Sequence, residues 1–249
     1  MSQPRLHQVL TNLFDSKDIS LFTECLLHED YGTFMNKHGL NFPRKELVQA
    51  FIHTSFSHEF NVPHQEKLEF LGDSVLQFIL TEELFKKFPN AKEGQLSKIR
   101  SSLVNEKILA QMARGLGLNE LILVGKGEFK KNLFEQSSVL ADSFEALLAQ
   151  VYQFQGLEFT KSLLLTWINK FVPGGFEEDF LEQFDVKSKL QEKVLAKYKK
   201  VPRYTSENKG DEFQITLWID DAPVTSGIFS SKKIGEKELA SEILKKGII

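Results

Sequence analysis

Between Tyr31 and about Phe171, apolar residues recur at intervals of three and four positions, without the alternation that marks a strand. This spacing places apolar side chains along one face of a helix, so the whole region is predicted to be α-helical. The preceding 28 residues contain shorter apolar stretches, which predict one or two small helices and no chemistry. In the main region the predicted helices span residues 68–87, 97–114, 139–154 and 160–171.

The pattern changes after a helix-breaking Pro-Gly-Gly sequence at residues 173–175. In the stretch Phe213–Ile219, apolar and polar positions alternate, which is typical of a half-buried strand. The elements predicted after the break are a helix over 186–200, strands over 213–219 and 223–229, a turn at Asp220-Asp221, and a helix over 232–245. We therefore expect an N-terminal extension (1–28), an all-α domain (29–172), a linker (173–184) and a small α+β domain (185–249).

Two helices of the all-α domain carry acids among apolar residues. Glu66, Glu69 and Asp73 stand at i, i+3 and i+7, which is one helix face, and Asp142 and Glu145 form a second pair at i and i+3. Carboxylates in such places repel one another and resist burial unless a cation compensates them. If the two helices pack side by side, their acids form an oxygen-rich site suited to Mg²⁺ or Mn²⁺ and to phosphodiester hydrolysis. The alternative for the first run is an ordinary acidic stripe facing solvent.

Other candidates are weaker. Glu93 is either an outer member of the acidic site or simply an acid at the start of a helix. His53, His58 and His64 lie near one another but match no zinc-binding spacing, so they are interpreted as structural or surface residues. The run Gly125-Lys126-Gly127 lacks the ending of a phosphate-binding loop and is interpreted as a turn.

Charge is distributed unevenly along the chain, although the 249 residues have a net charge of only −3. Residues 185–249 have a balance of +3 and the remainder a balance of −6. Lys232, Lys233 and Lys237 gather near the start of the last predicted helix, where positive charge opposes the helix dipole. That arrangement suits a docked phosphate, although a solvated lysine face is the alternative.

Cysteine content and hydropathy indicate the cellular compartment. The only cysteine, Cys25, excludes an intramolecular disulfide, which fits a reducing cytosol. There is no signal-peptide pattern and no apolar run long enough to span a bilayer. A soluble cytoplasmic protein without a membrane partner is expected.

Several short runs stand in order along the chain. They are His53-Thr54-Ser55-Phe56, the eleven residues from Glu66 to Leu76, Glu93-Gly94-Gln95-Leu96-Ser97, Arg100, Leu103-Val104, Gly125-Lys126-Gly127-Glu128, and the seven residues from Leu140 to Ala146. In these runs the chain resembles bacterial ribonuclease III, and the resemblance extends over nearly all of residues 31–249. Through residues 187–192, 202–204 and 231–233, the C-terminal part resembles a double-stranded-RNA-binding domain with α-β-β-β-α order.

The resemblance implies a homodimeric endoribonuclease that cuts both strands of double-stranded RNA with Mg²⁺, leaving 5′-phosphates and short 3′ overhangs. Its expected targets are ribosomal RNA and other structured precursors. By the motif match, Glu69, Asp73, Asp142 and Glu145 would hold the metal, and loss of Asp73 or Glu145 would abolish cleavage. Glu66 and Glu93 would be supporting acids nearer the dimer cleft, and the helix with Phe70 and Leu71 would build the dimer interface. The alternative is an RNA-binding scaffold of the same fold that has lost catalysis, as ribosome-associated relatives have.

For the C-terminal domain, the resemblance implies that Gln191 touches a minor groove of A-form RNA, while Lys232, Lys233 and Lys237 contact phosphates. The chain departs from the family pattern at Gln65 and Gln136, which puts substrate choice or rate in doubt. In the C-terminal domain, the loop 207–212 is short, and Phe229 and Gly235 replace a usual Gly and Ala. These changes predict weaker RNA binding than is typical.

Overall fold

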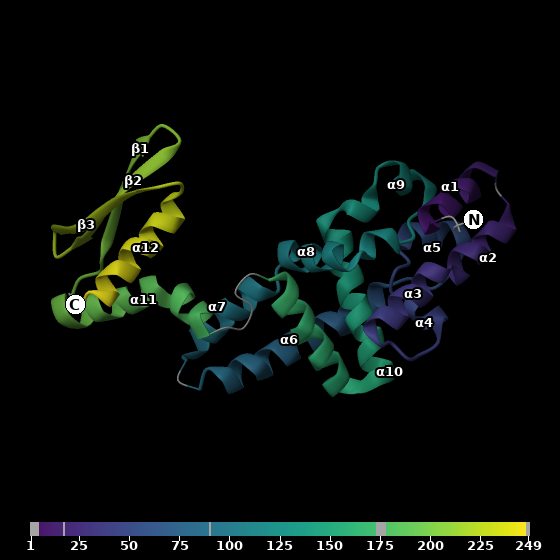
Figure 1. Ribbon diagram of the computed structural model, residues 1–249, viewed down its shortest axis with the longest axis horizontal. Helices are drawn as coiled ribbons and strands as arrows, with labels where there is room; N and C mark the ends of the chain where they lie inside the picture. The colour runs from purple at the N-terminus through teal and green to yellow at the C-terminus, as the bar shows by residue number, and fades with distance from the viewer. Residues whose placement is uncertain (1–4, 17, 90, 173–177, 248–249) are drawn as a thin grey trace. The chain divides into compact units, whose positions relative to one another are not determined.

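The computed structural model of the protein describes residues 5–16, 18–89, 91–172 and 178–247 (Figure 1). The chain divides into two compact units, residues 1–175 and residues 176–249. Within the described ranges, none of the helices combines the length and apolar character needed to cross a membrane.

The first unit is built from helices, as predicted. They are α1 (Leu6–Ser16), α2 (Ile19–Leu27), α3 (Glu29–His38), α4 (Arg44–Gln49), α5 (Thr54–Phe60), α6 (Glu66–Lys87), α7 (Glu93–Leu103), α8 (Glu106–Leu116), α9 (Lys126–Lys130) and α10 (Ser137–Phe171), with 3-10 turns at Leu118–Glu120 and Leu133–Glu135. A single parallel bridge between Ile52 and Leu123 is the only β-pairing described in this unit.

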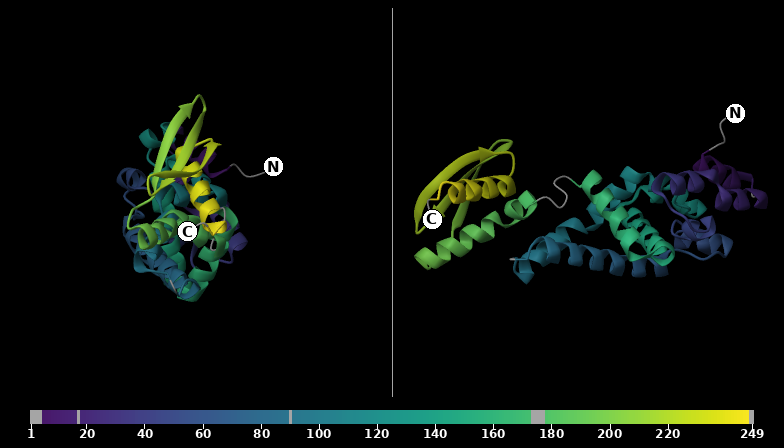
Figure 2. Two further views of the ribbon diagram at one scale, coloured as in Figure 1. Left: turned by 90° about the vertical axis from the view of Figure 1, so that its left-hand side faces the viewer. Right: turned by 60° about the horizontal axis from the view of Figure 1, so that its bottom comes forward.

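The centre of the first unit is the contact between α6 and α10, with α8 also packed against α10 (Figures 1 and 2). Leu76, Ile79 and Leu80 of α6 are fully buried there. Each such side chain contributes roughly 1.5–3 kcal/mol by leaving water. This core fixes the relative position of the two helices that carry the acids.

Two of the helix predictions differ from the structure. The predicted helix 97–114 is wrong, because the chain forms two helices that separate at Val104 and Asn105. The Asn105 side chain accepts the Ile108 N–H at 3.1 Å and so begins a new helix. In α10 the predicted gap between 154 and 160 narrows to one residue, Gly156, whose φ of 78° breaks the helical path.

The N-terminal region forms the two small helices that were predicted. We call α1 and α2 together the N-terminal hairpin. Its first helix buries five apolar side chains: Leu6, Val9, Leu10, Leu13 and Phe14. Cys25 of α2 is fully buried, and this burial raises the pKa of its thiol to about 12, which makes it unreactive at neutral pH.

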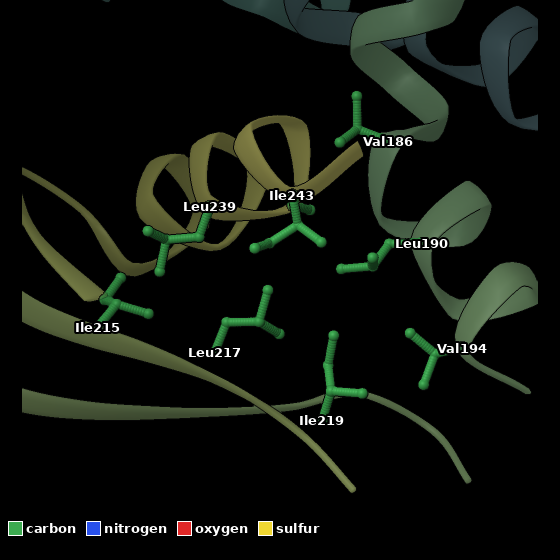
Figure 3. Close-up of a cluster of buried hydrophobic side chains, with 9 residues drawn as sticks. Val186, Leu190, Val194, Ile215, Leu217, Ile219, Leu239 and Ile243 are labelled. Carbon is green, nitrogen blue, oxygen red and sulfur yellow. The ribbon is translucent and has the colours of Figure 1, made fainter. Parts of the chain in front are cut away.

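The second unit has the predicted α-β-β-β-α order: α11 (Glu178–Tyr198), β1 (Arg203–Lys209), β2 (Glu212–Ile219), β3 (Ala222–Phe229) and α12 (Lys232–Lys245). The antiparallel sheet has the order β1-β2-β3, and both helices pack on one face of it (Figures 1 and 2). Leu190 of α11, Leu217 of β2 and Ile243 of α12 belong to this core and point toward one another (Figure 3). The helix α11 begins earlier than predicted, so residues 178–184, which were expected in a linker, are helical.

Both connections in the sheet are two-residue turns. Asp220 and Asp221 have φ values of 50° and 63°, as a type I′ hairpin turn requires, and this confirms the predicted turn. The first turn consists of Gly210 and Asp211, because β1 continues to Lys209 and β2 starts at Glu212. The loop expected over 207–212 is therefore shorter still, with most of its residues in strands.

Candidate active site

The two acid-bearing helices meet at Gly72. This glycine is buried in α6 between Glu69 and Asp73, and a carbon atom added to it would overlap the backbone carbonyl of Glu145 in α10. Only a hydrogen atom fits, so the two helix backbones are in contact at this point. A small buried cluster joins the same helices, and its members are Ala50, Leu68, Ala146 and Ala149.

This contact brings the four predicted metal ligands together. Glu69, Asp142 and Glu145 are half-buried, whereas Asp73 is exposed. Burial is the main cause that raises the pKa of Glu145 to about 8, followed by repulsion from Asp73, Asp142 and Glu69. Burial also raises the pKa of Glu69, with Asp142 as the next cause. The carboxylates of Glu69, Asp73 and Asp142 therefore lie close enough to Glu145 to repel it.

A fifth acid, which the sequence analysis did not single out, lies close to the group. Glu106, at the start of α8, follows burial as a cause of the raised pKa of Asp142. Its place in the sequence gave no hint of this, because Glu106 is far from both acidic runs along the chain.

The acids do not form a closed ligand cage as they stand. Within the described residues, no group of three or more acidic, His or Cys side chains is arranged to hold an ion. Side-chain rotation can change this, because the backbones that carry the acids already touch at Gly72. The donors fit a hard divalent cation, because all four are carboxylates and because burial, followed by repulsion from neighbouring acids, raises the pKa values of Glu69, Asp142 and Glu145.

A buried hydrogen bond ties the two helices beside the acids. The hydroxyl of Ser143, between Asp142 and Glu145, donates to Oε1 of Gln65 at 3.0 Å, and both residues are buried. Gln65 immediately precedes α6 and its N–H bonds the carbonyl of Ile52. This gives the departure at Gln65 a defined structural role, which is to hold the start of α6 against α10.

The two acids that were predicted to have a supporting role are both exposed. Glu66 is exposed and its carboxylate is 3.7 Å from Nδ1 of His64. Glu93 is exposed at the start of α7, where it accepts a hydrogen bond from the Ser97 hydroxyl at 3.0 Å. Among the causes of the raised pKa of Glu69, Glu66 ranks after burial and Asp142. No electrostatic link of Glu93 to the four acids is described.

Two motifs that were interpreted as structural are joined in space. The hydroxyl of Ser55 accepts the N–H of Gly125 at 2.9 Å and is 2.8 Å from Nδ1 of His53. In parallel, Glu59 of α5 accepts the Lys126 N–H at 2.8 Å. A Cβ on Gly125 would lie 2.5 Å from Oε1 of Glu59 and 3.0 Å from the carbonyl oxygen of Ser55, so a larger residue at this position would have to displace the Glu59 side chain. Through these contacts with Ser55 and Glu59, His53 and the Gly125 turn have a structural role, which is to hold the backbone at the start of α9 against α5.

Comparison with known proteins decides the family. The Ribonuclease-III-like family model matches residues 44–171. The chain is 36% identical over 225 residues to Ribonuclease 3 of Pseudothermotoga lettingae, covering 86% of this chain and 94% of that protein. It is also 36% identical over 211 residues to Ribonuclease 3 of Mycobacterium leprae, covering 82% and 88%.

The chain belongs to the ribonuclease III family. The nuclease domain of ribonuclease III from Campylobacter jejuni has a similar structure, with a TM-score of 0.53 at 37% identity, covering 56% of this chain and 96% of that one. This ribonuclease III family member is an endoribonuclease, so the alternative of a non-catalytic scaffold is set aside. Its nuclease fold is the first unit, and the second unit has the fold of a double-stranded-RNA-binding domain.

The predicted RNA-binding residues of this ribonuclease lie on two helices of the second unit. Gln191 is exposed on α11, Lys232 is exposed at the start of α12, and Lys237 is half-buried one turn later. The side chain of Lys233 lies outside the described part of the structure. The Ser231 hydroxyl caps α12 by accepting the Ile234 N–H at 3.2 Å.

Part of the basic charge of this unit is engaged within the unit itself. The ammonium of Lys187 lies 2.5 Å from the Glu236 carboxylate, and that of Lys200 lies within 2.9 Å of both Asp220 and Asp221. The surplus of lysines in the sequence therefore overstates the positive charge that is open to a nucleic acid.

Proposed function

We propose that this endoribonuclease hydrolyses phosphodiester bonds of double-stranded RNA with Mg²⁺, for which Mn²⁺ can substitute. The products would carry 5′-phosphates and short 3′ overhangs, and the natural substrates would be ribosomal RNA and other structured precursors in the cytoplasm. The support comes from the family to which the chain belongs, from its four clustered carboxylates and from its RNA-binding-type second unit.

The observation that carries the metal assignment is the state of Glu145. A carboxylic acid with a pKa of about 8 is mostly protonated at neutral pH, and a divalent cation would displace that proton. Glu69, Asp73, Asp142 and Glu145 would hold the ion, and Asp73 and Glu145 would be essential for cleavage. When bound, the metal would supply an activated water and stabilise charge on the leaving oxygen. The chain itself orients these carboxylates through the Gly72 contact and the Gln65–Ser143 hydrogen bond.

Glu66 and Glu93 would act as supporting acids at the edge of the substrate cleft, where both are exposed. In the second unit, Gln191 would touch a minor groove, and Lys232, Lys233 and Lys237 would contact phosphates. The short first turn of the sheet supports weaker binding than a longer loop would give, because fewer groups can reach a second groove.

A homodimer is the proposed assembly. Phe70, Phe78 and Phe85 of α6 are 79%, 54% and 71% exposed, although phenylalanine normally avoids water. At about 100° of turn per residue they lie within roughly 80° of one another, so they form one stripe along the helix. We call this set the α6 phenylalanine stripe. The solved structure of the Campylobacter jejuni nuclease domain describes structural flexibility in a region involved in dimer formation. That nuclease domain therefore forms a dimer, which supports the same assembly here.

The test of the proposed activity uses the full-length protein and a long perfect RNA duplex. With Mg²⁺ we expect short duplex products with 5′-phosphates, and no cleavage after chelation. Glu145→Gln should bind the duplex as the wild type does while cleaving at least about 10³-fold more slowly, because metal stabilisation of charge contributes several kcal/mol.

A matched acid controls for general charge effects. Glu158→Gln removes one exposed carboxylate from the second half of α10, beyond Gly156, and should leave the cleavage rate unchanged. Intact duplex after prolonged incubation of the wild type with Mg²⁺ or Mn²⁺ would refute the metal-dependent activity. Equal loss of cleavage in both variants would refute the assignment of Glu145.

A further inference from the structure

The N-terminal hairpin packs on one particular part of the nuclease unit. That part, which we call the α9 segment, consists of residues 125–136 and runs from the Gly125 turn through α9 to the start of α10 (Figure 1). The hairpin lies outside the residues matched by the family model, which begin at Arg44. The hairpin carries none of the proposed catalytic acids, so any effect that it has on catalysis must pass through the residues that it contacts.

The hairpin holds the α9 segment by one polar and several aromatic contacts. The ammonium of Lys126 donates to the backbone carbonyl of Phe14 at 2.5 Å. The His7 ring lies 5.4 Å from that of Phe129 and 4.4 Å from that of Phe134, and Phe14 lies 5.7 Å from Phe129.

A second line of contacts reaches the same segment through α5. Phe22 of the hairpin stacks on Phe56 and Phe60, with ring centroids 6.1 and 5.1 Å apart. The same helix α5 supplies Ser55 and Glu59, which accept the backbone N–H groups of Gly125 and Lys126. Both routes from the hairpin therefore converge on the beginning of the α9 segment.

The far end of the segment controls where α10 begins. Glu135 accepts a hydrogen bond from Asn119 at 2.8 Å, and its carbonyl accepts one from Arg114 at 2.6 Å. Among the described residues, α10 has no side-chain cap, because Gln136 at its N-cap position makes no such hydrogen bond. An uncapped first turn is held mainly by what precedes it. Asp142 follows only about one and a half turns later.

We propose that the N-terminal hairpin positions the α10 half of the active site, acting through the α9 segment on Asp142 and Glu145. This proposal deepens the proposed function and rests on its assignment of these two acids. In this proposal the hairpin positions the catalytic acids, whereas other surfaces of the protein bind the RNA. Lys126 is the central positioning residue, because its ammonium joins the hairpin directly to the segment.

The test compares Lys126→Met, which keeps the aliphatic stem but removes the hydrogen bond, with Lys126→Arg, which retains a donor. We expect Lys126→Met to speed amide exchange in residues 126–140 and to lower the single-turnover cleavage rate at saturating duplex about 10-fold, within the range known for residues that orient ligands. The dissociation constant for duplex measured without metal should stay within about twofold of the wild type. Lys126→Arg should restore most of the rate.

A second pair of variants separates positioning from general stability. His7→Ala loosens the aromatic contacts to the segment, whereas Phe34→Leu weakens the α3 core of the same unit. At equal loss of thermal stability, only His7→Ala should slow cleavage. Equal slowing by both variants, or faster exchange in 126–140 with an unchanged cleavage rate, would overturn the proposal.

The outcome remains distinguishable from failure of the proposed function. If the wild type fails to cleave with Mg²⁺, the proposed activity is refuted, while the exchange data still test whether the hairpin holds the segment. If the wild type cleaves and the Lys126→Met rate matches it, the activity stands and the positioning role is refuted.

Discussion

At residue scale, Gly72 sets the separation of the two helices on which the proposed catalytic acids lie. Replacement by Ala would push a methyl group into the carbonyl of Glu145. We expect Gly72→Ala to lower the free energy of unfolding by about 1–3 kcal/mol, as overpacking does, and to reduce cleavage strongly because the acids separate. Chemical denaturation and a cleavage assay measure the two effects.

Gly94 provides the matched control for this substitution. It also lies in a helix, α7, but an added carbon atom meets nothing within 4 Å among the described residues. Gly94→Ala should be neutral or stabilising by up to about 1 kcal/mol, because alanine favours the helix. If both substitutions had the same effect on stability, helix propensity rather than the contact with Glu145 would explain it.

Phe229 and Gly235 illustrate two departures from the family pattern that complement each other. A Cβ on Gly235 would collide with the Phe229 ring and the Ile215 side chain, so the glycine makes room for the phenylalanine. Glycine inside a helix costs about 1 kcal/mol relative to alanine, and in α12 this cost is offset by the packing of Phe229 on the core of the second unit.

This complementarity predicts a strong coupling between the two residues. Gly235→Ala alone should destabilise the second unit by about 1–3 kcal/mol, whereas in a Phe229→Ala background it should cost distinctly less, because only the contact with the end of the Ile215 side chain remains. Hydrogen exchange of the α12 amides measures each corner of the double-mutant cycle. Additive effects would show that the two side chains pack independently.

At the scale of elements, α3 packs on the second half of α10 through a histidine. The His38 ring lies against Phe34 and Trp167, and within the described residues its buried Nε2 has no hydrogen-bond partner. Burial, followed by Lys37 and Lys170, lowers the pKa of His38 to about 4 from its usual 6.5. The folded protein therefore favours the neutral ring.

The sign of the resulting pH dependence follows directly. Between pH 6.5 and about 4 the unfolded chain binds more protons at this residue than the folded one, so stability falls as the pH decreases through that window. Allowing for the partial exposure of the ring, we expect a loss of roughly 1–2 kcal/mol. NMR titration of His38 and urea unfolding at both ends of the window check this, and His38→Gln should flatten the slope. A slope that persists in His38→Gln would assign it to other groups.

Elements differ in how far the sequence alone can predict them. The spacing of Glu69 and Asp73, and of Asp142 and Glu145, was sufficient to place two acids on one face of each of two helices. The packing of these helices on each other was only a condition of the predicted site, and the role of the acids as metal ligands stays a prediction. The break at Val104 was missed because apolar spacing continues through it, and only the cap at Asn105 reveals it. The strand β1 was not assigned to residues because it is nearly all polar and exposed, so no alternation marks it. The contact at Gly72 cannot be predicted from the sequence alone, because it depends on which residue of α10 lies opposite Gly72 in the folded protein.

At the scale of the whole molecule, the α6 phenylalanine stripe should decide the oligomeric state. We expect the wild type to sediment as a dimer of the 28.5 kDa chain and the double variant Phe78→Glu, Phe85→Glu to sediment as a monomer. Buried aromatic residues often contribute 2 kcal/mol or more each to an interface, and a carboxylate cannot replace them. Sedimentation equilibrium measures the change. Leu27→Glu, at an exposed apolar residue of α2, should remain dimeric; a dimer in all three proteins would rule out the stripe as the interface.

The division of the chain into two units separates cleavage from much of the salt-dependent binding. All four acids lie in residues 1–175, so that fragment should still cut duplex RNA at low salt. Its affinity should fall less steeply with salt than that of the full chain, because the slope of log K against log salt decreases by about 0.9 for each phosphate contact that is removed.

Single lysines sharpen this prediction, because their ammonium groups differ in what they already bind. Lys232 is exposed at the start of α12 with its ammonium over the Phe213 ring, whereas the ammonium of Lys187 is bound to Glu236. Lys232→Ala in the full chain should reduce the salt slope by about 1, and Lys187→Ala should leave it nearly unchanged. Titration of duplex RNA at several salt concentrations measures both slopes. If Lys187→Ala lowered the slope as much as Lys232→Ala, the pairing with Glu236 would not persist in the complex, and the net charge of the unit would predict binding better than its free lysines.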